Sequence, residues 1–114
     1  MEYTSIKLKD IGVDVSSVIS RLGGNELLYL NICHKFLQDQ NFQLFQRAIT
    51  TKNYEVAKIY IHTLKGVSAN LGFIRLEHLC KAINDHLNCN DTISLLDNVN
   101  ALSEEYYNII SVLK

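Results

Sequence analysis

The chain contains no proline, and only five of its 114 residues are glycine. Because these two residue types interrupt regular structure most strongly, helices can run along most of this sequence. Apolar residues recur at the helical period and strand signals are absent, which predicts an all-α domain. The expected architecture is an antiparallel four-helix bundle with a short additional helix at its N-terminal end.

Long apolar runs are also missing, since the longest unbroken aliphatic or aromatic run is Leu27–Leu30. A membrane-spanning helix needs about 20 apolar residues, and residues 1–10 lack the apolar centre of a signal peptide. Eleven Lys and Arg against twelve Asp and Glu give a formal net charge of −1, too balanced to attract nucleic acid or an anionic membrane. We therefore expect a cytoplasmic domain that contacts neither, and any anion binding must be local.

The chain has only three cysteines, and they are far apart or without a paired motif. Cys33, Cys80 and Cys89 are odd in number and form no Cys-x-x-Cys motif. This usage suits a reducing compartment in which the thiols are buried or inert. The length fits a single domain over residues 1–114, in which residues 1–10 are expected to be poorly ordered or peripheral.

Turn and capping residues divide the chain into helical segments. A first short helix ends at Gly23-Gly24, and Asn25 and Asn53 are candidate caps of later helices. The expected later segments lie at about 26–38, 42–49, 54–69, 73–87 and from 92 onward. The helix over 26–38 is apolar on more than one side, so part of it, including Leu28 and Ile32, is a candidate docking surface.

One histidine faces away from the apolar side of its own helix. At about 100° per residue, Tyr60, Leu64 and Leu71 lie roughly opposite His62, which should point outward. Its neighbours on the outward face are spaced three, four or seven residues away: Glu55, Lys58, Lys65, Gly66 and Ala69.

These neighbours make the His62 position chemically distinctive. A neutral imidazole is a competent nucleophile near neutral pH, and the Lys65 ammonium could hold phosphoryl oxygens as a point charge. Glycine inside a helix costs about 1 kcal/mol relative to alanine, so Gly66 needs a reason, and close approach by another molecule is one. The other histidines, His34, His78 and His86, are interpreted as ordinary solvated or core side chains.

Two segments resemble a known family. The run IHTLKGVSANLG, Ile61–Gly72, is similar to the His-x-x-Lys-Gly signature of histidine-containing phosphotransfer (HPt) domains of phosphorelays. Upstream, RLGGNELLY, Arg21–Tyr29, resembles the segment before the second helix of HPt modules in hybrid sensor kinases. This likeness favours the C-terminal module of a hybrid sensor histidine kinase, and a membrane sensor kinase is then a candidate parent protein.

The resemblance implies a phosphorelay role. His62 would accept a phosphoryl group from the phospho-aspartate of one receiver domain and pass it to an aspartate of another. Lys65 would steady the phosphoryl oxygens, Gly66 and Ala69 would leave room for the receiver, and Gly72 would mark the turn between helices. The chain itself would need no cofactor and no ATP site, because the receiver supplies Mg²⁺, and we expect it to be monomeric and not an enzyme.

Three further residues are candidates for flanking His62. Family members often carry a glutamine on the following helix that orients the histidine; by spacing the match is Asn84, with Lys81 one turn earlier. Asparagine is shorter than glutamine, and a solvated polar face is an equally good interpretation of both residues. Lys58 is the third, on the helix of His62 itself.

Other functions find less support in the sequence. A bundle that scaffolds receivers or other proteins would need neither the nucleophile nor the exposed glycine. A metal-binding bundle would use inward Glu-x-x-His pairs, but no histidine here has Asp or Glu three residues before it. No base and orienter beside a Ser or Cys indicate a hydrolase, and no phosphate-binding glycine loop indicates a kinase.

Overall fold

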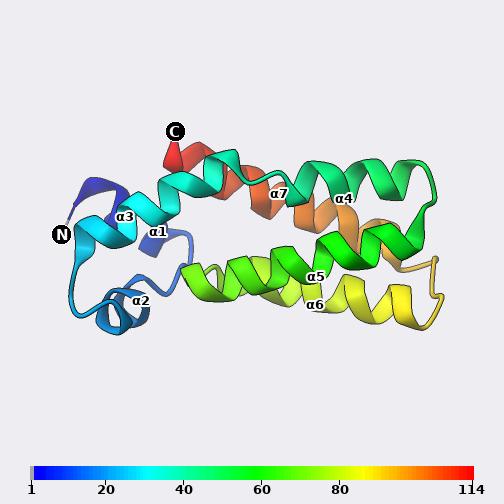
Figure 1. Ribbon diagram of the computed structural model, residues 1–114, viewed down its shortest axis with the longest axis horizontal. Coiled ribbons are helices and arrows are strands. Elements are labelled where there is room, and N and C mark those ends of the chain that lie inside the picture. Colours follow the sequence, from blue (N-terminus) through cyan, green and yellow to red (C-terminus); the bar gives the residue numbers. More distant parts are fainter. Residues whose placement is uncertain (1) are drawn as a thin grey trace.

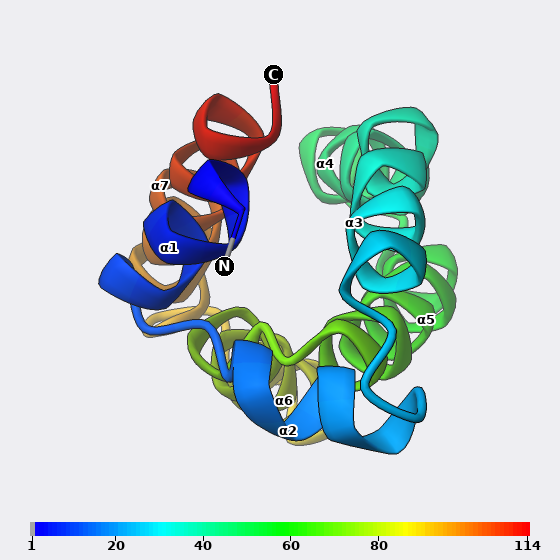
Figure 2. The same cartoon turned by 90° about the vertical axis from the view of Figure 1, so that its left-hand side faces the viewer.

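The computed structural model describes residues 2–114, in which all regular structure is helical. The long helices are α3 (Glu26–Lys35), α4 (Asn41–Thr50), α5 (Tyr54–Leu71), α6 (Ile74–Asn88) and α7 (Leu95–Leu113), and the short ones are α1 (Tyr3–Asp10), α2 (Val15–Arg21) and the 3₁₀ turn η1 (Phe36–Gln38). α3, η1 and α4 follow one another along one edge, so that this arm forms a four-helix bundle with α5, α6 and α7 (Figures 1 and 2). The predicted all-α bundle is confirmed.

Large buried side chains hold the four helices of the bundle together. α5 packs between α4 and α6, and α7 packs on α6 (Figure 2). Across the remaining side, Phe42 of α4 stacks on Tyr106 of α7 with ring centroids 4.0 Å apart, and the Phe36 ring of η1 lies 5.7 Å from the same tyrosine ring. Such aromatic pairs contribute about 0.5–1.5 kcal/mol each beyond their buried area. The core thus fixes α5 as a stiff element with one face free.

Capping residues set the helix boundaries. The Asn25 side chain accepts a hydrogen bond from the Leu28 amide at 3.0 Å, and Asn53 accepts one from the Val56 amide at 3.4 Å. Gly23 and Gly24 have φ angles of 71° and 82°, which is the left-handed stop expected after the first short helix. These signals start α3 and α5 where the sequence predicts.

Gly72 ends α5 in a conformation that few other residues could adopt. Its φ is 78°, and a Cβ built there would lie 2.8 Å from the Asp14 carbonyl oxygen. The Asp14 amide in turn donates to the Gly72 carbonyl at 2.9 Å. The turn between α5 and α6 is therefore locked against the start of α2.

The sequence predicts a poorly ordered or peripheral segment over residues 1–10, and the structure describes a short helix in this region. Residues 3–10 form α1, which packs on α7 (Figure 2), and its Leu8 and Ser5 are fully buried. The N-terminal attachment thus contains two short helices, α1 and α2, instead of one. Met1 lies outside the described residues.

Candidate functional site

His62 lies near the middle of α5 on the face that points away from the core. Its neighbour Ile61, and Ala57 and Leu64 on roughly the opposite side of the helix, are completely buried, whereas His62 is exposed. Among residues 2–114 its ring has no hydrogen-bond partner. The imidazole is presented to solvent by a helix that is held between two others.

Lys65 and Lys58 lie one turn after and one turn before His62, and both are half-buried. The Lys58 ammonium lies 3.2 Å from the Glu55 carboxylate. Burial raises the pKa of the Cys80 thiol on α6 to about 12, and the positive charge of Lys65 partly opposes this rise. Lys65 therefore lies toward α6, and it is the cation on this face without a carboxylate partner among the described residues.

Gly66 opens the surface beside His62. It is exposed, and a Cβ built on it would find no atom within 4 Å. The fold of this chain therefore does not require glycine there, in contrast to Gly72. Ala69, one turn further, is half-buried, so small side chains continue along the same strip.

Sequence reasoning missed Ile59, which is 63% exposed on α5. It lies three residues before His62 and thus shares its face. The same spacing rule that selects Lys65 would have found it. The surface around His62 therefore offers an apolar side chain, Ile59, in addition to the positive charge of Lys65 and the open space at Gly66.

The two candidates on α6 have separate surroundings. Asn84 is half-buried, and Lys81 is exposed with its ammonium 3.4 Å from the Asp85 carboxylate. No hydrogen bond joins either of them to His62 within residues 2–114. Their flanking role thus remains a prediction.

Leu28 and Ile32 lie on α3, and Ile32 borders two adjoining hollows. Leu28 is 41% exposed and Ile32 is half-buried. Ile32 lines both a hollow of about 340 Å³ between α2, α3 and α5 and one of about 230 Å³ between α3 and α5. Asn70 and Leu71 of α5 line both as well. An apolar depression therefore extends from α3 to the C-terminal part of the helix that carries His62.

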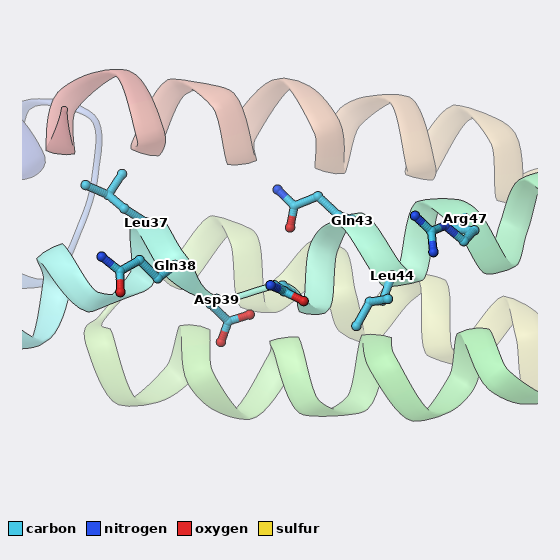
Figure 3. Close-up of a pocket in the computed structure, with 7 residues that line it drawn as sticks. Leu37, Gln38, Asp39, Gln43, Leu44 and Arg47 are labelled. Carbon is cyan, nitrogen blue, oxygen red and sulfur yellow. The ribbon is translucent and has the colours of Figure 1, made fainter.

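A separate hollow lies where η1 meets α4 (Figure 3). Its lining contains none of the residues predicted from the sequence to form the site. Gln43 points from it toward α7, and its amide donates to the Tyr106 hydroxyl at 3.0 Å (Figure 3). This hollow is therefore formed by η1, the turn after it and α4, away from the residues around His62.

Each of the remaining histidines and cysteines differs from His62 in its surroundings. His34 and His78 are exposed, and His86 hydrogen-bonds to Asp91. Cys33 and Cys80 are buried, whereas Cys89 is exposed. No group of three His, Cys, Asp or Glu side chains within residues 2–114 is arranged to hold a metal ion.

A four-helix bundle that presents one solvent-facing histidine with a nearby lysine and an exposed glycine has the form of a phosphoryl carrier. Comparison with protein families agrees, because the family model of the Hpt domain matches residues 34–111. The chain belongs to the Hpt domain family and has a histidine phosphotransfer role in a phosphorelay. No curated protein and no solved structure matched the chain. Within the described residues, no helix is long and apolar enough to cross a membrane.

Proposed function

We propose that His62 is the phosphoryl acceptor of this Hpt domain. It would take the group from the phospho-aspartate of one receiver domain and transfer it to the aspartate of another. The observation that carries the proposal is the exposure of His62 on α5 beside the uncrowded Gly66. His34 and His78 are also exposed, but neither has this combination of a half-buried lysine three residues on and an open glycine four residues on.

The chemistry needs little from this chain beyond position and charge. An unprotonated ring nitrogen of His62 attacks phosphorus, the N–P bond forms, and the P–O bond breaks with its electron pair leaving on the aspartate carboxylate. In the second transfer, the aspartate of the other receiver attacks phosphorus, a new P–O bond forms, and the N–P bond breaks with its electron pair returning to the imidazole. Phosphoryl transfer depends mainly on alignment and neutralisation of the oxygens, so Lys65 would stabilise them while the receiver supplies Mg²⁺ and the acidic pocket.

Docking would use the surface on both sides of the histidine. Gly66 and Ala69 leave space for the partner backbone, and Ile59 offers an apolar contact on the opposite side of His62. Leu28 and Ile32 would extend this contact onto α3, where Ile32 lines two hollows. Scattered exposed apolar residues are common, but Ile32 lines two hollows that are also lined by Asn70 and Leu71 of the helix that carries His62.

Transfer of label from a phosphorylated receiver tests the acceptor directly. The wild-type chain should become labelled through a bond that is labile in acid and stable in base, as a phosphoramidate is. His62→Gln should abolish labelling while the circular dichroism spectrum stays unchanged, because the side chain is exposed. Undiminished labelling of His62→Gln would contradict the proposal, and receiver binding without any labelling of the wild type would indicate a scaffold.

A further inference from the structure

A second histidine forms a bridge at the far end of the bundle, where α6 turns into α7 (Figure 1). The His86 Nδ1 atom lies 3.1 Å from the Asp91 carboxylate, and its Nε2 atom lies 2.8 Å from the Asn98 amide nitrogen. His86 is on α6, Asp91 in the connecting turn and Asn98 on α7. One imidazole therefore links all three segments.

The orientation of Asn98 determines which ring nitrogen of His86 carries hydrogen. The Asn98 amide nitrogen also donates to the Ser94 carbonyl at 3.0 Å. A carbonyl oxygen can only accept, so the nitrogen of the amide, not its oxygen, must face both Ser94 and the imidazole. His86 Nε2 must then accept, which leaves Nδ1 as the donor to Asp91. The bridge is complete only with a neutral imidazole in the Nδ1–H form.

The carboxylate of Asp91 does more than hold the ring. Its other oxygen accepts hydrogen bonds from the Ile93 and Ser94 amides at 3.2 and 3.4 Å. These amides precede the first residue of α7, Leu95. Asp91 therefore connects His86 to the residues at the start of α7.

We propose that His86 is a proton-sensitive latch that ties α6 to the first turn of α7 while its ring is neutral. At lower pH, Nε2 would take up a second proton from solvent. The protonated Nε2 and the Asn98 amide nitrogen would then both be hydrogen-bond donors and would face each other. Asn98 would then have to rotate, losing its contacts with both His86 and the Ser94 carbonyl. The hydrogen bond to Asp91 would survive as an ion pair, so the α7 side of the bridge opens first.

Asp91 is the charged group that faces the ring. On the neighbouring elements, Asp85 of α6 pairs with Lys81, Lys58 of α5 pairs with Glu55, and Asp97 of α7 is exposed. Among all these charged groups and Asp91, it is Asp91 that lies within salt-bridge distance of His86. Its attraction for an imidazolium and the opposing Asn98 donor act on different ring nitrogens, so they can be separated by substitution.

Nuclear magnetic resonance of the ¹⁵N-labelled chain tests the latch. At pH 8 the His86 ring nitrogens should show the Nδ1–H tautomer, whereas the exposed His78 on the same helix serves as the reference. On acidification, the protection factors of the amides over residues 95–98, which are the intrinsic exchange rates at each pH divided by the measured rates, should fall by up to about tenfold, the effect of one lost hydrogen bond. An Nε2–H tautomer of His86 at pH 8 would overturn the proposal.

Two variants separate the latch from general acid effects. Asn98→Ala removes the opposing donor, so the protection factors over residues 95–98 should be low at both pH values and should not change on acidification. His78→Gln should keep the wild-type dependence. If Asn98→Ala and the wild type respond equally to acid, the latch does not exist.

Discussion

His62 and Lys65 divide the proposed chemistry between a nucleophile and a charge. Because no carboxylate among the described residues pairs with Lys65, its ammonium is available to the phosphoryl oxygens, whereas Lys58 is held by Glu55 at 3.2 Å. A charged hydrogen bond made in the transition state commonly contributes a factor of ten or more to the rate. The two lysines on the His62 face should therefore differ in importance.

Lys65→Ala is expected to slow transfer from a phosphorylated receiver by at least about tenfold while changing the receiver Kd much less. Lys58→Ala is the matched control, since it removes a lysine from the same face, and it should have the smaller effect on rate. Single-turnover transfer and titration calorimetry measure the two quantities. An equal loss of rate and affinity in Lys65→Ala would show that this lysine serves docking instead.

Gly66→Gln should leave the bundle folded but block the partner. The side chain enters open space and raises helix propensity, so the free energy of unfolding should not fall. Receiver affinity should fall by about tenfold or more, because a glutamine would occupy the gap beside His62. Normal affinity and normal transfer in this variant would refute the clearance argument.

Two glycines of α5 and its C-terminal end have different structural roles. Gly66 and Gly72 are both within or at the end of the segment that carries His62, yet their structural roles differ. Gly66 has helical geometry and no close neighbour, whereas Gly72 has a φ of 78° and approaches Asp14. The same substitution at the two positions should therefore have opposite effects on stability.

Gly66→Ala should stabilise the chain by about 0.5–1 kcal/mol, since alanine is the better helix former and nothing obstructs its methyl group. Gly72→Ala should destabilise it by about 2 kcal/mol or more through left-handed strain and the clash with the Asp14 carbonyl. Urea denaturation followed by circular dichroism measures both. Similar changes in the two variants would contradict this interpretation.

Glu105 is a buried carboxyl on α7 that makes stability depend on pH. Burial raises its pKa above the ordinary value of 4.5, and the Arg75 guanidinium, 3.7 Å away, only partly opposes this. Between the ordinary and the raised pKa the folded chain binds more protons than the unfolded chain. The contribution of Glu105 to the free energy of unfolding therefore falls as the pH rises through this interval.

Glu105→Gln should remove that dependence, because the amide does not titrate. Relative to the wild type, the variant should gain stability as the pH rises from about 4.5 toward neutrality. Denaturation curves of both proteins at several pH values give the difference directly. A constant difference across this range would mean that the Glu105 pKa is the same in the folded and unfolded chains.

The sequence allowed most of the helices to be predicted because their caps and apolar periods are local signals. Asn25, Asn53 and the Gly23-Gly24 pair mark boundaries that the structure reproduces. α1 was missed because its start lacks a side-chain cap and Leu8 is its only buried apolar residue. Its stability comes from packing on α7, which is distant in the chain.

The candidate site was predictable to the extent that it lies on one helix. The exposure of His62 and the burial of Leu64 follow from spacing alone. The hollows beside Ile32 could not be predicted, because they depend on how α2, α3 and α5 meet. The bridge of His86 likewise joins residues from three segments, so spacing along one helix gives no sign of it.

The molecule as a whole acts as a rigid support for one side chain. Its buried core holds α5 on two sides, and its aromatic contacts close the bundle opposite them. We therefore expect all phosphoryl chemistry at the His62 ring, although the chain has four histidines and three of them are exposed.

The most direct test is to locate the phosphoryl group after transfer from a receiver, by peptide mass spectrometry at neutral pH. The account predicts phosphate on His62 alone, with unchanged yield in the His34→Gln and His78→Gln variants. Phosphate on His34 or His78 in the wild-type chain, with His62 unmodified, would contradict it.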